Sequence, residues 1–213
     1  MQEYHKIQSI FKRDPDNNFK TFIDGDWSLP EFEYLADNSW AGTEKVDGTN
    51  IRVIYEANGF ENTVIFKGKT EKAQIPPFLL IKLAELFPVE HFIENELPSL
   101  CLYGEGYGAK IQKAGGNYIP DGVCFVLFDV MINGIWLERE NIEDIGKRLH
   151  IKVVPVVFIH TLINAIELIK SKTLVSSWNP SVLAEGLVLK PECELKDRLG
   201  NRIITKIKHK DFE

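Results

Sequence analysis

The stretch NIRVIYEANGFENTVIFKG, residues 50–68, gives the clearest indication of the fold. Two runs rich in β-branched and aromatic residues, 50–57 and 62–68, flank the dipeptide Asn58-Gly59. Asn-Gly is the strongest short-range signal for a hairpin turn between two strands. We therefore expect two neighbouring strands that run antiparallel.

The rest of the chain adds strands more often than helices. Helical spacing of apolar residues predicts helices over 77–87, 138–149 and 161–172. Further strands are predicted at 100–103, 123–132, 153–159, 184–190 and 202–207, whereas the first fifty residues look mostly irregular. Strands and helices do not alternate regularly, which favours an α+β fold with antiparallel sheets over a doubly wound parallel sheet.

Length and composition are those of an ordinary globular protein. The chain has 213 residues, 44% hydrophobic and 26% charged, and we expect a single domain over residues 1–213. No apolar run approaches the roughly 20 residues of a membrane span, and the N-terminus lacks a signal peptide. The three cysteines lack metal-ligand spacing, so we expect free thiols in the cytoplasm, with Cys101 and Cys124 buried.

The net charge of −6 argues mildly against a nucleic-acid partner. Lysines nevertheless gather locally at Lys67, Lys69 and Lys72, at Lys110 and Lys113, and over residues 196–210. A basic groove on an acidic protein therefore stays possible, and the global charge excludes little.

The segment EKVDGTN, residues 44–50, contains the first candidate for chemistry, Lys45. An ordinary lysine has a pKa near 10.4, so only about 0.04% is free amine at pH 7. A nucleophilic lysine needs neighbouring cations or desolvation, and Lys206 and Lys208 could supply the cations. The alternative is a surface lysine beside an Asp-Gly turn.

Two strand-associated segments offer a carboxylate and an aromatic ring. YGEGYGA, residues 103–109, superficially fits the dinucleotide fingerprint, but no apolar helix follows, so that interpretation fails. What remains is Glu105 on a turn of small residues, which is either structural or open to a ligand. In FVLFDV, residues 125–130, Phe128 is either core or a stacking platform for a purine.

Two C-terminal segments add a second carboxylate and paired cations. Glu185 precedes the apolar run GLVLK and either binds a metal through water or faces solvent. Lys206 and Lys208 are two residues apart, so they share one face of a strand. Such a pair suits a triphosphate, and the alternative is an exposed basic edge strand.

These segments together resemble the motifs of the covalent nucleotidyltransferases, in order and approximate spacing. The elements that match are Lys45-x-Asp47-Gly48, Gly104-Glu105, Phe128-Asp129, Glu185–Lys190 and Lys206-Ile207-Lys208. The likeness extends over about residues 40–212 and is greatest to the RNA ligase 2 family of ATP-dependent RNA ligases. It implies a nucleotidyltransferase domain of the DNA ligase and mRNA capping enzyme type, ATP-grasp-like, with two antiparallel sheets flanked by helices and ATP between the sheets.

The resemblance implies a role for each matched residue. Lys45 would attack the α-phosphate of ATP and form a lysyl-adenylate, which then activates a polynucleotide 5′-phosphate for sealing to a 3′-hydroxyl. Glu185 would bind Mg²⁺ or Mn²⁺, with Glu105 as a second metal ligand. The remaining implied contacts with ATP come from Glu44 through its backbone, Phe128 by stacking, and Asn50, Lys69, Glu105, Lys206 and Lys208.

Three departures from the family pattern leave the substrate open. Asp47 stands where many RNA ligase 2 members have His, and Lys69-Thr70 stands where Arg-Thr is more usual. The additional C-terminal or OB domain of many relatives is not expected here, so a separate nucleic-acid-binding domain or protein is a candidate partner. We expect a monomer that acts on RNA ends, with DNA ends, a capping activity and a noncatalytic nucleic-acid-binding relative as alternatives.

Overall fold

The computed structural model describes residues 3–59 and 61–213, and the chain divides into two compact units. The first unit contains the N-terminal residues through His5 together with Asp47–Val154. The second contains Lys6–Val46 together with Pro155–Glu213. Each unit has its own sheet and its own apolar core, so each is described by itself. The single domain expected over residues 1–213 stays a prediction.

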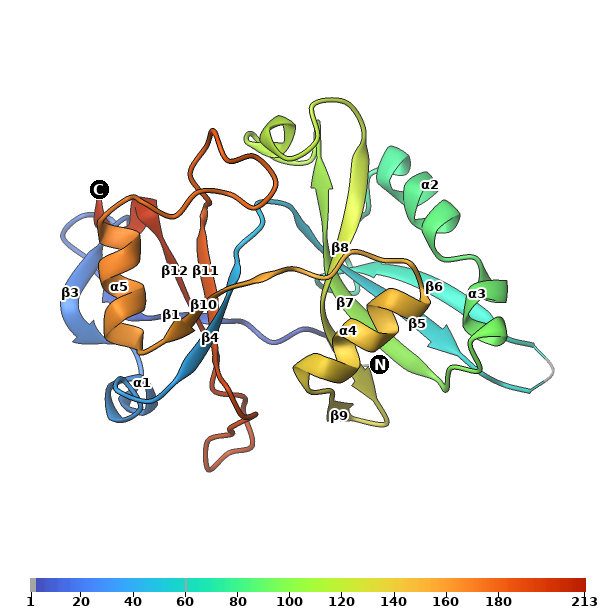
Figure 1. The fold of residues 1–213 in the computed structure, drawn as a ribbon, viewed down its shortest axis with the longest axis horizontal. Coiled ribbons are helices and arrows are strands. Elements are labelled where there is room, and N and C mark those ends of the chain that lie inside the picture. The colour runs from blue at the N-terminus through green and yellow to red at the C-terminus, as the bar shows by residue number, and fades with distance from the viewer. Residues whose placement is uncertain (1–2, 60) are drawn as a thin grey trace. The chain divides into compact units, whose positions relative to one another are not determined.

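The first unit is built on a five-stranded antiparallel sheet in the order β6-β5-β7-β8-β9 (Figure 1). Its strands are β5 (Thr49–Glu56), β6 (Thr63–Gly68), β7 (Leu100–Gly108), β8 (Val123–Ile132) and β9 (Ile135–Trp136). Its helices are α2 (Pro77–Leu86), α3 (Val89–Glu94), α4 (Arg139–Arg148) and the 3-10 turn η1 (Gly115–Asn117). The predicted hairpin is confirmed as the β5–β6 pair, with residue 60 outside the described residues.

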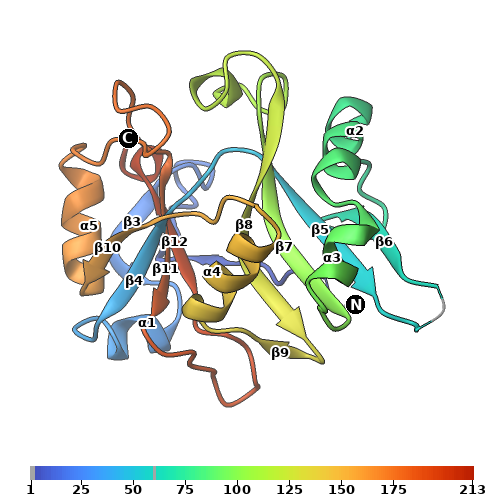
Figure 2. The same cartoon turned by 45° about the vertical axis from the view of Figure 1, so that its right-hand side comes forward.

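One face of this sheet carries the core of the first unit. Alternate residues of β5, including Ile51 and Val53, pack with Leu79 and Leu83 of α2. Helices α3 and α4 add to the same core, and Figure 2 shows the helices along one face of the sheet. The intervening positions of β5, such as Arg52, belong to the opposite face. Asn50 of β5 and its cross-strand partner Glu105 of β7 therefore lie on that second face.

The second unit contains a five-stranded sheet in the order β1-β12-β11-β4-β10 and a separate pair, β2-β3. Its strands are β1 (Gln8–Ser9), β2 (Phe11–Arg13), β3 (Phe22–Trp27), β4 (Trp40–Glu44), β10 (Val156–His160), β11 (Gly186–Pro191) and β12 (Thr205–Lys208). Its helices are α1 (Pro30–Tyr34), α5 (Leu162–Lys170) and the 3-10 helix η2 (His209–Phe212). Neighbouring strands are antiparallel except β1 and β12, which run parallel.

Helix α5 provides most of the helical part of the second core. Thr161 caps its N-terminus by accepting the Asn164 N–H at 3.2 Å. Its buried residues, which include Leu162 and Ile169, pack in one cluster with Trp40 of β4 and with residues of β11 and β12. The three strands that carry or directly adjoin the predicted Lys45, Glu185 and lysine-pair segments, β4, β11 and β12, therefore pack against one apolar cluster.

The α+β class and the antiparallel sheets are as predicted, but three segments differ from expectation. The first fifty residues contain more regular structure than expected, because they form β1 to β4 and α1. The predicted strand at 153–159 is divided, since Val153 pairs with Leu127 of the first unit and β10 begins only at Val156. At Pro155 the chain passes from the first unit back to the second. Strand β7 continues through Gly104-Glu105 to Gly108, where a turn was expected.

The cysteines are free, as expected, but differ in burial. Cys101 on β7 is buried, Cys124 on β8 is only partly buried, and Cys193 is exposed. The expectation that Cys124 is buried is therefore only partly right. Among residues 3–59 and 61–213, none of the helices has the length and apolarity to cross a membrane.

Candidate active site

A carboxylate of the second unit lies between two lysines. Lys45 Nζ donates to Glu185 Oε2 at 2.6 Å, and Lys208 Nζ lies 2.6 Å from Glu185 Oε1. The three side chains retain only 16–21% of their full exposure. The structure therefore brings together three residues that the sequence predicted from segments about 20 to 160 positions apart.

Strand pairing explains how these three residues meet. Strand β11 lies between β4 and β12, and its residues pair with the last residues of both. Lys45 directly follows β4 and donates its backbone N–H to Gly186 O at 2.9 Å. A Cβ at Gly186 would lie 2.0 Å from Ile207 O, so only glycine permits this approach of β11 to β12. The close approach sets Glu185 beside Lys208.

The charges around Glu185 alter its acidity. Burial by itself would raise the pKa of Glu185, but Coulombic attraction to Lys45 and hydrogen bonds from Lys208 and Lys45 outweigh it. The pKa of Glu185 is therefore held below its ordinary value. The carboxylate stays ionised at neutral pH and is available to cations.

Lys206 and Lys208 share one face of β12, as the period of two predicted. Thr205 and Ile207 are buried, while the two lysines are partly exposed on the other face. Strand β12 is not an edge strand, because β1 pairs with one side of it and β11 with the other. The alternative of an exposed basic edge is therefore wrong.

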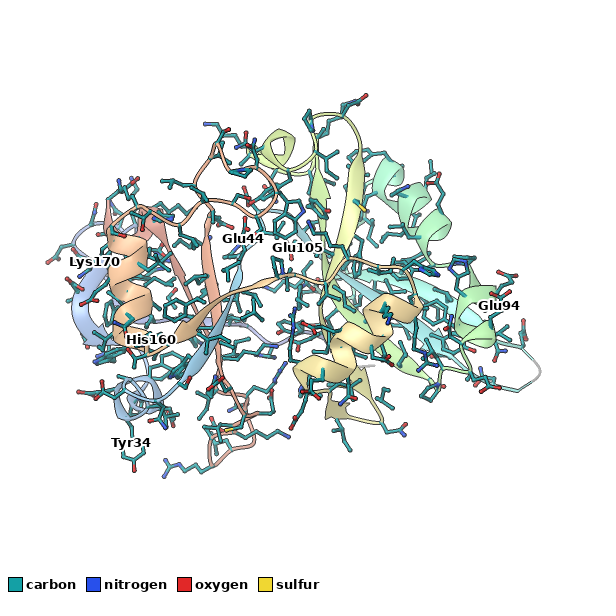
Figure 3. All side chains as sticks on the ribbon, in the orientation of Figure 1. Tyr34, Glu44, Glu94, Glu105, His160 and Lys170 are labelled. Atoms are coloured by element: carbon teal, nitrogen blue, oxygen red, sulfur yellow. The ribbon has the colours of Figure 1, made fainter. Side chains whose placement is uncertain are left out.

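Glu44, the last residue of β4, is 2% exposed, and its label in Figure 3 lies on this strand. Its Oε2 accepts the backbone N–H of Ser177 at 2.7 Å, which ties the segment between α5 and β11 to the end of β4. Within the described residues its Oε1 is buried without a hydrogen-bond partner. Ser177 was not predicted, since a backbone donor 133 positions away leaves no mark in the sequence.

In the first unit, Asn50 of β5 and Glu105 of β7 are direct cross-strand partners. Glu105, labelled in Figure 3, is half-buried inside a strand rather than on the expected turn. The Gly-rich sequence suggested a turn, but Gly104 and Gly106 are needed for packing, since a Cβ at Gly104 would lie 2.1 Å from the Phe125 ring. Asn50 Oδ1 is buried and, among the described residues, lacks a hydrogen-bond partner.

The turn that follows Lys45 is held by two side chains that the sequence did not reveal. The Asp47 backbone N–H donates to Tyr118 Oη at 3.0 Å, and Gln112 Nε2 donates to Gly48 O at 3.0 Å. A Cβ at Gly48 would lie 2.3 Å from Gly106 O, so this position requires glycine. The Asp-Gly element predicted next to the lysine is thus a fixed part of the first unit.

Phe128 lies at a β-bulge in β8. Tyr103 pairs with Asp129 and the next residue of β7 pairs with Leu127, so Phe128 is the extra residue. Bulges redirect side chains and occur often beside active sites. The Phe128 ring also meets Tyr4 edge-on, with centroids 5.1 Å apart, and Tyr4 Oη donates to Asp129 Oδ2 at 2.5 Å. Tyr4 was missed because the N-terminus looked irregular.

Lys69 is exposed immediately after β6. Its neighbour Lys67 pairs with Glu71 at 2.5 Å, and the buried Arg52 reaches the same carboxylate at 2.9 Å. These two cations lower the pKa of Glu71, chiefly through the hydrogen bond from Lys67. Within the basic cluster predicted around residues 67–72, the charge of Lys67 is therefore already balanced.

Comparison with known proteins shows the family of this chain. A family model described as RNA ligase matches residues 38–208, well over half of the sequence. This chain belongs to the RNA ligase family. The matched range contains every residue proposed above for chemistry, from Glu44 to Lys208. Comparison with curated protein sequences found no match.

Solved RNA ligases from Naegleria gruberi have a similar fold. The structure with PPi aligns at a TM-score of 0.63 and 20% identity over 98% of this chain and 58% of that one. A mutant with ATP and Mn aligns at a TM-score of 0.66 and 20% identity, over 98% of this chain and 56% of that one. Another mutant with ATP and Mn aligns at a TM-score of 0.63 and 21% identity, over 99% of this chain and 60% of that one. This chain therefore spans less than two thirds of the length of these RNA ligases.

A divalent metal in this RNA ligase family member would find few protein ligands. Over residues 3–59 and 61–213, the structure has no group of three or more His, Cys, Asp or Glu side chains arranged to hold a metal. Mg²⁺ usually keeps several waters and takes one or two carboxylates together with substrate phosphates. Glu185 fits such a mostly hydrated ion as a single carboxylate donor, whereas metal binding by Glu105 stays a prediction.

Proposed function

We propose that this protein is the catalytic core of an ATP-dependent RNA ligase and that Lys45 is its nucleophile. The observation that carries the proposal is the Lys45–Glu185–Lys208 cluster, in a chain of the RNA ligase family. In adenylyl transfer from ATP, a lysine can act as the nucleophile and a second cation can stabilise charge on the phosphates, while an ionised carboxylate can hold a metal ion. Nucleic-acid binding alone would not require this half-buried arrangement.

In the proposed first step, Lys45 Nζ forms a bond to the α-phosphorus of ATP. The bond from that phosphorus to the bridging oxygen breaks, and pyrophosphate leaves. Lys45 begins as the ion-pair partner of Glu185, so its ammonium first gives one proton to solvent water, and the free amine then attacks. Lys206 and Lys208 contact the phosphates and stabilise the charge that develops there.

The metal and the first unit have proposed roles as well. Mg²⁺ or Mn²⁺ would be held by Glu185 through its water shell and would neutralise phosphate charge. The adenine would stack on Phe128, with the Glu44 backbone as a hydrogen-bond partner. Asn50, whose buried Oδ1 accepts no hydrogen bond from the described residues, and Glu105 would meet the ribose and the reacting phosphate. Lys69 would supply a further phosphate contact.

AMP then passes to an RNA 5′-phosphate, and a 3′-hydroxyl displaces it to seal the strand. The partner of the chain is therefore RNA with free or nicked ends. Because the chain spans only 56–60% of the Naegleria ligases, a further domain or a separate protein that holds RNA is part of the proposal. The core acts as a monomer in the cytoplasm.

Intact-mass spectrometry after mixing with ATP and Mg²⁺ tests the proposal. We expect one covalent AMP on the wild-type chain and none on Lys45→Ala. Lys45→Arg is the sharper variant, because its guanidinium can still pair with Glu185 but is not a nucleophile. Lys82→Ala, which removes an exposed lysine of α2, is the matched control and should be modified like the wild type.

A DNA ligase core is the second candidate, because Asp47 is the form common in DNA ligases. The adenylylated protein should be offered RNA and DNA strands with identical sequences in competition. Faster sealing of RNA supports the proposed function, and faster sealing of DNA supports the second candidate. Replacing ATP by GTP tests the capping alternative, for which the adduct would be GMP.

A further inference from the structure

The C-terminal 3-10 helix η2 contains a buried carboxylate outside the cluster described above. Asp211 is 1% exposed, and its Oδ1 lies 2.8 Å from Arg13 Nη2 on β2. Its Oδ2 accepts the backbone N–H of Lys208 at 3.2 Å. Asp211 therefore joins the end of β2 to the backbone of a lysine that contacts Glu185.

Arg13 is itself held in place by several contacts. Its guanidinium donates to Phe19 O at 3.3 Å and to Lys20 O at 3.1 Å. It also lies over the Phe22 ring, 5.1 Å from the centroid. A guanidinium fixed in this way presents one N–H to Asp211 in a defined direction, so the carboxylate has little freedom to move.

The backbone at Lys208 is fixed from two sides. Lys208 ends β12, and the next N–H, that of His209, donates to Glu185 O at 3.3 Å. Asp211 holds the N–H of Lys208 itself. The direction in which the Lys208 side chain leaves the strand therefore depends on a bond made by a residue three positions further along the chain.

We propose that Asp211, oriented by Arg13, is a positioning residue that keeps the Lys208 amine at Glu185 for adenylyl transfer. This inference rests on the proposed function. Both Arg13 and Asp211 lie outside residues 38–208, the range of the family match. Without Asp211 the end of β12 loses a hydrogen bond, and the amine of Lys208 samples positions away from Glu185.

Asp211 also stabilises the fold, and the experiment must separate this structural role from the proposed positioning of Lys208. Removing one member of a buried ion pair leaves the other charge without its partner, which destabilises a fold. Asp211→Ala should therefore be compared with Leu162→Ala, which opens a cavity in the core of the same unit. Leu162 begins α5, whereas His209, next to Lys208, contacts Ile169 O near the other end of that helix. The double variant Arg13→Met with Asp211→Ala removes both charges and replaces Asp211→Ala if that chain does not fold.

The measurement is the single-turnover rate of lysyl-AMP formation at saturating ATP, on chains shown to be folded by thermal unfolding. We expect Asp211→Ala to react about tenfold more slowly than the wild type, as for loss of a bond to a charged group. Leu162→Ala, at similar stability, should react at nearly the wild-type rate. Asp211→Asn keeps an acceptor for the Lys208 N–H and should recover most of the loss.

Each outcome of this experiment has a distinct meaning. Equal rates for Asp211→Ala and Leu162→Ala, or no recovery in Asp211→Asn, would overturn the positioning role while the wild-type adduct still supports the proposed function. A wild-type chain that takes up no AMP would overturn both. A slow Asp211→Ala, a fast Leu162→Ala and a recovered Asp211→Asn establish the inference.

Discussion

Lys45 Nζ lies 2.6 Å from Glu185 Oε2 although 140 residues separate them along the chain. The contact follows from the pairing of β4 with β11, in which Glu44 is opposite Leu187. Each residue of the ion pair directly flanks one of these strands. The pair is thus positioned by backbone hydrogen bonds, and its geometry does not depend on a flexible loop.

Replacing Glu185 by Gln should greatly reduce lysyl-AMP formation. The amide keeps the size of the side chain, but it removes the negative charge shared by Lys45 and Lys208 and a proposed metal ligand. We expect the rate to fall about 10²-fold or more, as for other removals of electrostatic groups at a reacting centre. Intact-mass time courses measure the rate, and Glu192→Gln, at an exposed position, is the control. An unchanged rate in Glu185→Gln would contradict the prediction.

Glu185 should also make stability depend on pH. Its pKa is lowered in the folded chain, so it stabilises the fold fully above the ordinary glutamate pKa of about 4.3. This contribution is lost as the pH falls through the lower folded value. Chemical unfolding of wild type and Glu185→Gln between neutral and acid pH should show a difference that shrinks as the pH decreases. A constant difference would contradict the ion pairing.

The sequence predicted much of the fold because its strands carry strong local patterns. The 50–68 hairpin and the α2, α4 and α5 helices follow from turn chemistry and apolar spacing. Short elements at the N-terminus were missed, since β1 and β2 have only two and three residues. The strand predicted at 153–159 was divided because apolar spacing does not show where a chain leaves one core for another.

The residue types of the candidate site could be predicted from the sequence, but the contacts that hold these residues in place could not. Lys45, Glu185 and Lys208 stand in recognisable segments, and the structure brings them together. Their supports, such as Ser177 on Glu44 and Asp211 on Lys208, act through backbone groups. A backbone donor has no residue-type signature, so pattern and spacing cannot reveal such contacts.

Gly186 should tolerate no side chain. In Gly186→Ala the Cβ would meet Ile207 O at 2.0 Å, so β11 and β12 must separate locally. We expect a loss of about 1–3 kcal/mol or more in the free energy of unfolding, in the range of overpacked sites. Gly116→Ala is the matched control, because a Cβ there meets nothing within 4 Å. Urea unfolding of both variants decides the point, and equal stabilities would refute the close approach.

The three thiols should differ in reactivity. Burial raises the pKa of Cys101 to about 11, partly opposed by a hydrogen bond involving Tyr103, so little thiolate forms at pH 8. Exposed Cys193 should therefore react first with a thiol reagent, and Cys101 only after unfolding. Mass mapping of labelled peptides measures the order, and Cys193→Ser should abolish the fast phase. Rapid labelling of Cys101 in the folded chain would contradict its burial.

Phe128 tests the proposed contribution of the first unit to nucleotide binding. Its place at a β-bulge and the edge-on contact with Tyr4 restrict its ring, which suits a stacking platform. Aromatic stacking on a base contributes about 1–3 kcal/mol, so Phe128→Leu should raise the KM for ATP about tenfold or more. Phe128→Trp should retain a low KM, since its ring also stacks, and exposed Phe78→Leu is the matched control. Initial rates of lysyl-AMP formation against ATP concentration give these values. A Phe128→Leu chain with an unchanged KM would show that adenine does not stack on this ring.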